Sequence, residues 1–165
     1  MDFTSRKLPR LKNFDYSQNG YYFITICTKD MQCLLSSVVG ADDLGSPHVE
    51  LKNYGKIVEK NINLMNDIYK NMNVESYAIM PNHIHLLIHI FNSFQGSPRS
   101  STPTNLISKF VSAFKKFTNK EADANLWQRG FHDHIIRNEE DLYYHIQYIN
   151  ENPKKWIMGK DEYYA

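Results

Sequence analysis

Two histidines and, about sixty residues later, a tyrosine and an asparagine have the types and spacing of a metal site beside a nucleophile. His83 and His85 lie in an apolar run that predicts a β-strand, where side chains at i and i+2 point to the same face. Tyr148 and Asn152 are one helical turn apart in a segment that predicts a helix. Two imidazoles can present one edge to a metal ion, and a helix can bring a phenol and an amide oxygen to it. A metal-assisted nuclease that attacks DNA with its own tyrosine needs this combination.

Spacing alone leaves other interpretations open. His83 and His85 also fit half-exposed positions on a strand whose opposite face is branched aliphatic, and Tyr148 also fits an aromatic that covers the sheet. His132 and His134 have the same i, i+2 spacing and form a competing pair. That second pair could bind metal, contact nucleic acid, or simply be the polar positions of an edge strand.

The elements that must position these residues follow from periodicity and from turn residues. We expect strands at 21–28, 74–80, 83–91 and 131–137, helices at 54–69, 104–119 and 138–152, and a loop or small hairpin at 36–48. Asn138 is expected to cap the last helix, and Pro153 to end it at about Asn152. Strands separated by helices, with one tight β-β connection, predict an antiparallel sheet with helices packed on it.

The 165 residues predict a single domain, 1–165, with a basic N-terminal arm at 1–15 and a flexible loop at 92–103. The formal net charge is only +1, so any basic surface for nucleic acid must be local. Lys109, Lys116 and Lys120 form one stripe of a predicted helix, and Arg10 belongs to the basic arm. A solvated helix face is the alternative for the lysine stripe.

Several function classes lack support in the sequence. Cys27 and Cys33 have neither zinc-knuckle nor redox spacing, so we expect reduced thiols in a cytoplasmic protein. The longest apolar stretch, 86–91, is too short to span a bilayer, and no membrane partner is expected. The chain has no phosphate-cradling glycine loop and no G-x-S-x-G, so we expect no nucleotide cofactor and no serine esterase chemistry. Amidohydrolase barrels also carry H-x-H, but such a barrel needs about 250 residues, so this chain is too short for that class.

Taken together, five segments resemble the single-tyrosine HUH transposases, and most closely the REP-associated tyrosine transposases. The matching segments are YYFITICT at 21–28, MPNHIH at 80–85, WQR at 127–129, HIIRNE at 134–139 and YINENP at 148–153. They occur in the family's order and cover the chain from about Arg10 to Trp156. Each segment alone is a weak signal, whereas the combination is specific.

The resemblance implies an α+β fold with a ferredoxin-like βαββαβ core and a C-terminal helix that carries the tyrosine. It implies that His83, His85 and Asn152 hold a divalent ion, Mg²⁺ or Mn²⁺. It also implies that Tyr148 attacks single-stranded DNA and leaves a 5′-phosphotyrosine and a free 3′-OH. Insertion-sequence relatives usually have Gln where Asn152 stands. The family's tail of small residues and glycine is replaced here by the segment 154–156.

Single-stranded or hairpin-forming repeat DNA is therefore the expected partner, and a homodimer is left open. The expected DNA contacts are Arg10, Lys109, Lys116, Lys120, Arg129, His134 and Arg137. A catalytically silent nucleic-acid-binding domain of the same fold is the alternative, and a purely structural interaction domain is a third hypothesis. Metal-dependent nicking separates the enzyme from both.

Overall fold

The computed structural model describes residues 19–40, 45–91 and 105–163. The elements are β1 (Gly20–Cys27), the 3-10 turn η2 (Lys29–Met31), β2 (Ser36–Val39), β3 (His48–Leu51), α1 (Asn53–Ile68), β4 (Met72–Ile79), β5 (His83–Ile90), α2 (Leu106–Ala122), β6 (His132–Ile135) and α3 (Glu139–Ile157). All four expected strands and all three expected helices are present. The segment left open as a loop or small hairpin forms the two-stranded sheet β2–β3.

The main sheet has the order β4-β5-β1-β6, with every neighbouring pair antiparallel. In chain order its strands and the first two helices run β1-α1-β4-β5-α2-β6. The prediction of a ferredoxin-like core is therefore confirmed. The histidine-bearing strand β5 lies between β4 and β1, and β6 is an edge strand.

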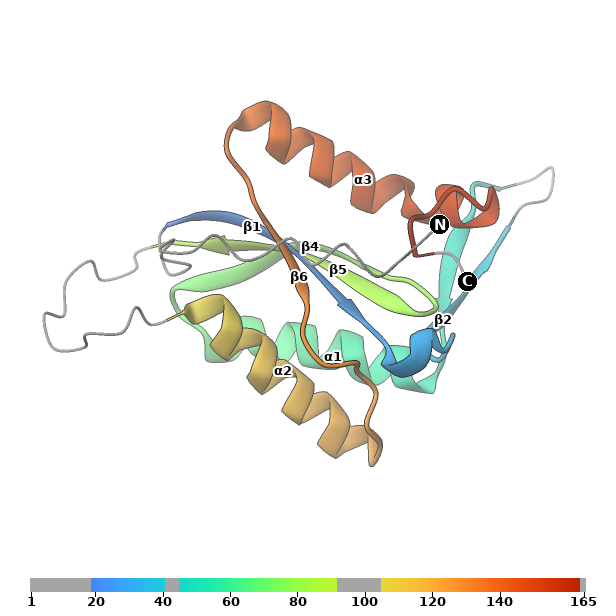
Figure 1. The fold of residues 1–165 in the computed structure, drawn as a ribbon, viewed down its shortest axis with the longest axis horizontal. Helices are drawn as coiled ribbons and strands as arrows, with labels where there is room; N and C mark the ends of the chain where they lie inside the picture. Colours follow the sequence, from blue (N-terminus) through green and yellow to red (C-terminus); the bar gives the residue numbers. More distant parts are fainter. Residues whose placement is uncertain (1–18, 41–44, 92–104, 164–165) are drawn as a thin grey trace, which may run out of the picture.

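The sheet separates two layers (Figure 1). Helices α1 and α2 cover one face, and α3 crosses the other. Alternate side chains of β5 pack in the two layers. Ile84, Leu86 and Ile88 pack in the core with α1 and α2, whereas Leu87 packs with Ile149 of α3. The histidines of β5 share the parity of Leu87 and therefore face α3.

Helix α3 begins as expected but ends later than expected. The Asn138 side chain accepts a hydrogen bond from the backbone N–H of Asp141, which confirms the cap. The helix then continues through Pro153 to Ile157, so the expected end at Asn152 is wrong. Proline removes one backbone donor. The extra helical turn packs Trp156 against the core between the sheet and α3, and this burial offsets the hydrogen bond lost at Pro153.

The remaining boundaries shift by a few residues. Helix α2 starts at Leu106, where the Asn105 side chain accepts from the backbone N–H of Ser108, and extends to Ala122. Strand β6 is shorter than the expected 131–137. The expected arm at 1–15 and loop at 92–103 lie outside the described residues. Within the described part of the chain, no helix is both long and apolar enough to cross a membrane.

Candidate active site

Three buried side-chain atoms of the described chain have no hydrogen-bond partner: His83 Nε2, His85 Nε2 and Asn152 Oδ1. All three side chains are at most 1% exposed. Buried polar atoms are nearly always paired, because an unpaired one loses its hydration without compensation. Two imidazole nitrogens and an amide oxygen left unpaired together form a donor set for a cation. They are the three residues expected to hold the divalent ion, and we call them the histidine–asparagine site.

The other ring nitrogen of each histidine is already engaged. Nδ1 of His83 donates to Asn82 Oδ1 at 2.8 Å, and Nδ1 of His85 lies 2.8 Å from the Thr25 hydroxyl. The contact with Asn82 fixes the His83 tautomer and leaves its Nε2 lone pair free, and the contact with Thr25 fixes the orientation of the His85 ring. Asn82 belongs to the tight β4–β5 turn, and Thr25 lies opposite His85 across the β1–β5 pair.

Burial keeps both imidazoles neutral. It lowers the pKa of His83 to about 3, although Asn152 opposes the shift. Burial also lowers the pKa of His85 well below its usual value, and His83 adds to the effect. Neutral imidazole is the form that binds metal. The alternative interpretation of these residues as half-exposed strand histidines is therefore wrong. The third histidine of the strand, His89, is partly exposed and stacks on Tyr21 instead.

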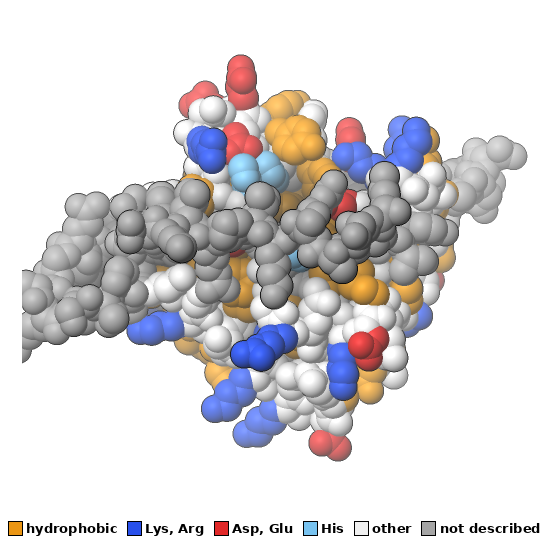
Figure 2. All heavy atoms as spheres, viewed as in Figure 1, with side chains coloured by type: hydrophobic (Ala, Val, Ile, Leu, Met, Phe, Trp, Pro, Cys, Tyr) orange, Lys and Arg blue, Asp and Glu red, His pale blue; other side chains and the backbone are white. Residues whose placement is uncertain are grey.

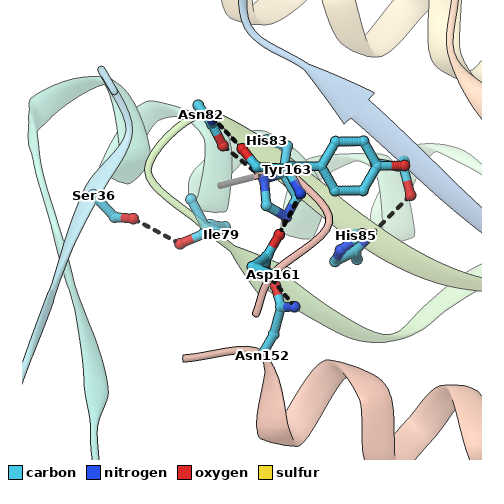
Figure 3. Close-up of polar contacts among 9 residues, drawn as sticks. Ser36, Ile79, Asn82, His83, His85, Asn152, Asp161 and Tyr163 are labelled. Atoms are coloured by element: carbon cyan, nitrogen blue, oxygen red, sulfur yellow. Dashed lines mark hydrogen bonds and ion pairs between the residues drawn. The ribbon is translucent and has the colours of Figure 1, made fainter. Parts of the chain in front are cut away.

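Asn152 is held by a residue that the sequence did not point to. Its Nδ2 donates to Asp161 Oδ2 at 2.8 Å, which leaves its Oδ1 unpaired (Figure 3). The same carboxylate oxygen lies 4.0 Å from His83 Nε2. Asp161 thus orients the amide and brings a carboxyl group beside the unpaired atoms, and burial raises the pKa of that group. It follows α3 in a segment with no periodicity or motif, so sequence spacing offered no signal for it.

Tyr148 lies beside the histidine pair. Its ring centroid is 5.2 Å from that of His85, at 75°. The Lys155 ammonium lies 4.5 Å from the centre of the same ring. Burial raises the pKa of Tyr148, and the charges of Asp161 and Glu162 raise it further. The phenol is therefore protonated in the metal-free protein and needs a nearby positive charge to ionise.

A second tyrosine also lies against the histidine pair. The Tyr163 ring is 4.6 Å from that of His83 and 5.8 Å from that of His85 (Figure 3). Burial raises its pKa, while a hydrogen bond with Thr25 opposes the rise. Tyr163 is thus a structural rival to Tyr148 as a nucleophile, and the motifs did not single it out.

The expected DNA-binding residues are not gathered at this site. Lys109, Lys116 and Lys120 are exposed on α2, in the layer on the other side of the sheet. Figure 2 shows basic side chains over that part of the molecule. Arg129 and Arg137 are exposed on either side of β6, and Arg10 lies outside the described residues.

The second H-x-H pair does not form one chelating unit. His132 is exposed, and its ring lies 6.3 Å from that of Tyr163. His134 instead contacts Asp141 and His145 of α3. Of the open interpretations, an edge strand with polar positions fits β6, and His134 acquires partners that the spacing could not reveal.

The fold and the site define a ferredoxin-like domain in which a tyrosine-bearing helix is packed across a central histidine strand. A REP-associated tyrosine transposase solved with a REP hairpin has a similar fold, with a TM-score of 0.60 at 19% identity over 90% of this chain and 74% of that one. No family model matches the chain.

Two of three proteins with similar sequences carry the same family name as the similar structure. An uncharacterised protein of Haemophilus influenzae is 29% identical and covers 92% of this chain and 89% of its own length. A second protein of that organism, provisionally named a REP-associated tyrosine transposase, is 26% identical over 86% of this chain and 74% of its own length. The REP-associated tyrosine transposase of Escherichia coli is 30% identical over 51% of this chain and 47% of its own length. The resemblance predicted from the motifs is therefore confirmed.

Proposed function

We propose that the protein is a metal-dependent endonuclease and strand transferase that acts on single-stranded, hairpin-forming DNA through a covalent 5′-phosphotyrosine. The observation that carries the proposal is the coincidence of the three unpaired buried atoms of His83, His85 and Asn152 with Tyr148 beside them. Relatives named REP-associated tyrosine transposases, one of them solved with a REP hairpin, support DNA as the substrate and transposition or repeat mobilisation as the context.

His83, His85 and Asn152 would hold the divalent ion, with Asp161 orienting the amide. Two imidazole nitrogens suit Mn²⁺ better than Mg²⁺, which prefers an all-oxygen octahedron. When bound, the ion polarises the scissile phosphate and neutralises the charge that builds up in the transition state. The ligand nitrogens are already neutral and oriented, so the site needs no deprotonation of its imidazoles before binding.

The chain's own residues carry out the transfer. Tyr148 Oη loses its proton as it forms the bond to phosphorus, and the bond between phosphorus and the 3′-oxygen breaks. The 5′ end stays on the tyrosine, and the departing 3′-oxygen takes up a proton. Lys155, above the Tyr148 ring, favours the phenolate that forms during attack. The phosphodiester energy is kept in the phosphotyrosine bond, so rejoining needs no nucleotide cofactor.

The test uses a hairpin-bearing single strand labelled at the scissile phosphate, which stays with the downstream strand. We expect a covalent protein–DNA product on a denaturing gel with Mn²⁺, little or none with EDTA, and reversal when excess 3′-OH strand is added. Binding without any adduct would favour the catalytically silent nucleic-acid-binding domain. A free 5′-phosphate product with no adduct at any time would show that water, and not the tyrosine, attacks the phosphate.

The lysines of α2 provide a separate prediction. Since they lie across the sheet from the histidine–asparagine site, we propose that they contact the hairpin stem rather than the cleaved phosphodiester. Replacing Lys109, Lys116 and Lys120 by glutamine should lower the slope of log K against log salt by about 2–3, or roughly 0.9 per lost phosphate contact. The measurement is hairpin affinity at several salt concentrations.

The matched control replaces three exposed lysines elsewhere, Lys29, Lys56 and Lys70, by glutamine. It removes the same charge and should leave the slope nearly unchanged. Equal slopes for the two triple variants would make the α2 stripe an ordinary solvated face.

A further inference from the structure

A second group of metal-binding side chains lies where β6 leads into α3. His134 comes from β6, whereas Asp141 and His145 lie one turn apart near the start of α3. One donor atom from each lies within 4.8 Å of the other two. Among the described residues, no other three His, Cys, Asp or Glu side chains meet in this way.

The Asp141 carboxylate joins the two imidazoles. Its Oδ2 lies 2.9 Å from His134 Nε2, and its Oδ1 lies 3.1 Å from His145 Nδ1, which is hydrogen-bonded to the Asp141 backbone carbonyl at 2.8 Å. A tetrahedral ion with ligands at about 2.1 Å holds neighbouring donor atoms about 3.4 Å apart. The two histidine rings are stacked, with centroids 4.6 Å apart and planes at 20°. The donor atoms, at 2.9 Å, at 3.1 Å and all within 4.8 Å of one another, bracket that tetrahedral spacing.

The cluster is accessible to solvent on one side. The His134 side chain is 42% exposed, whereas those of Asp141 and His145 are 19% and 12% exposed. Figure 2 shows a histidine patch at the surface beside the position of α3. Burial lowers the pKa of His145, which keeps its ring neutral. Although burial raises the pKa of Asp141, hydrogen bonds from His134 and from the Arg137 backbone lower it overall. The Asp141 carboxylate is therefore ionised and the His145 ring neutral at neutral pH.

We propose that His134, Asp141 and His145 form a second metal site, which binds a borderline transition-metal ion of the Zn²⁺ class. Two imidazoles and one carboxylate are a typical zinc donor set, with water at the remaining position. An ion there links the end of β6 to the first turns of α3. It thereby stabilises the placement of the helix that carries Tyr148 and Asn152.

This site is separate from the histidine–asparagine site. The two share no residue, and the Phe23 ring lies between them, 5.0 Å from that of His85 and 4.6 Å from that of His145. The proposal does not rest on the proposed DNA chemistry. A protein that never cleaved DNA would still bind the second ion.

The experiment titrates Zn²⁺ and Co²⁺ into the metal-free full-length protein carrying His83→Ala and His85→Ala, which removes the first site. We expect one remaining equivalent by equilibrium dialysis, with Co²⁺ d–d absorption of a four-coordinate complex. Adding His134→Ala or His145→Ala should weaken that binding at least about 10-fold. His132→Ala, on the same short strand but outside the cluster, should leave it unchanged.

A measurement on the unaltered protein covers the case in which the multiple variants do not fold. Histidine-ring NMR with added Zn²⁺ should shift the nitrogen signals of His134 and His145 and leave those of His132 in place. The proposal is overturned if those two rings do not respond to Zn²⁺. It is also overturned if a folded His134→Ala, His145→Ala protein retains the full stoichiometry.

Discussion

Tyr148→Phe should eliminate the covalent DNA adduct while fold, metal binding and hairpin binding remain. The substitution removes only the hydroxyl, and the ring that packs against Phe23 and His85 is kept. Loss of a nucleophile from an otherwise intact site lowers the rate by about 10³-fold or more. Adduct formation on a labelled strand, quantified against total hairpin bound, measures the effect.

Two other tyrosines make the assignment testable within the same site. Tyr144, one turn earlier on α3, is 59% exposed, and Tyr163 covers the histidine rings. Tyr144→Phe and Tyr163→Phe should both retain the adduct, and peptide mapping should find the DNA on Tyr148. An adduct mapped to Tyr163, or a Tyr148→Phe protein that nicks at full rate, would reject Tyr148 as the nucleophile.

His83→Ala combined with His85→Ala should remove the stabilisation that Mn²⁺ gives through the histidine–asparagine site. A ligand at about 100 times its dissociation constant adds about 2.7 kcal/mol to the free energy of unfolding. For a domain of this size that corresponds to a Tm increase of about 5–10 °C. Mg²⁺ should give a smaller increase, because nitrogen ligands suit it poorly. Thermal unfolding of each variant, with and without metal, measures the difference.

The control is His89→Ala, on the same strand and the same face, which should keep the full Mn²⁺ increase because its ring stacks on Tyr21. Each variant is compared with its own metal-free form, since removing two buried side chains itself lowers stability. An undiminished Mn²⁺ increase in the double variant would move the main site elsewhere, first to the cluster around His134.

Local sequence patterns predicted the four strands of the main sheet and the three helices, and left the hairpin β2–β3 and several boundaries open. Successive side chains of β5 point to opposite faces of the sheet, because a strand has a period of two. Both faces are covered, so alternate residues pack in two different cores. The cap at Asn138 needs only residues within one turn, so it could be predicted. The end of α3 could not. Pro153 lacks the backbone N–H that would continue the helix. The burial of Trp156 against residues far away in the sequence nevertheless favours continuing the helix to Ile157.

The histidine–asparagine site likewise has a part that the sequence predicted and a part that only the tertiary structure decided. Spacing showed that His83 and His85 share a strand face, and it left other interpretations open. The family resemblance carried by the motifs singled out His83, His85 and Asn152 as ligands. That the unpaired atoms of all three are buried together depends on how α3 packs across the sheet. Only the tertiary structure placed Asp161 against Asn152, Tyr163 over the histidines, and His134 beside α3 rather than with His132. Those contacts join side chains whose separation along the chain carries no periodicity, so packing alone decides them.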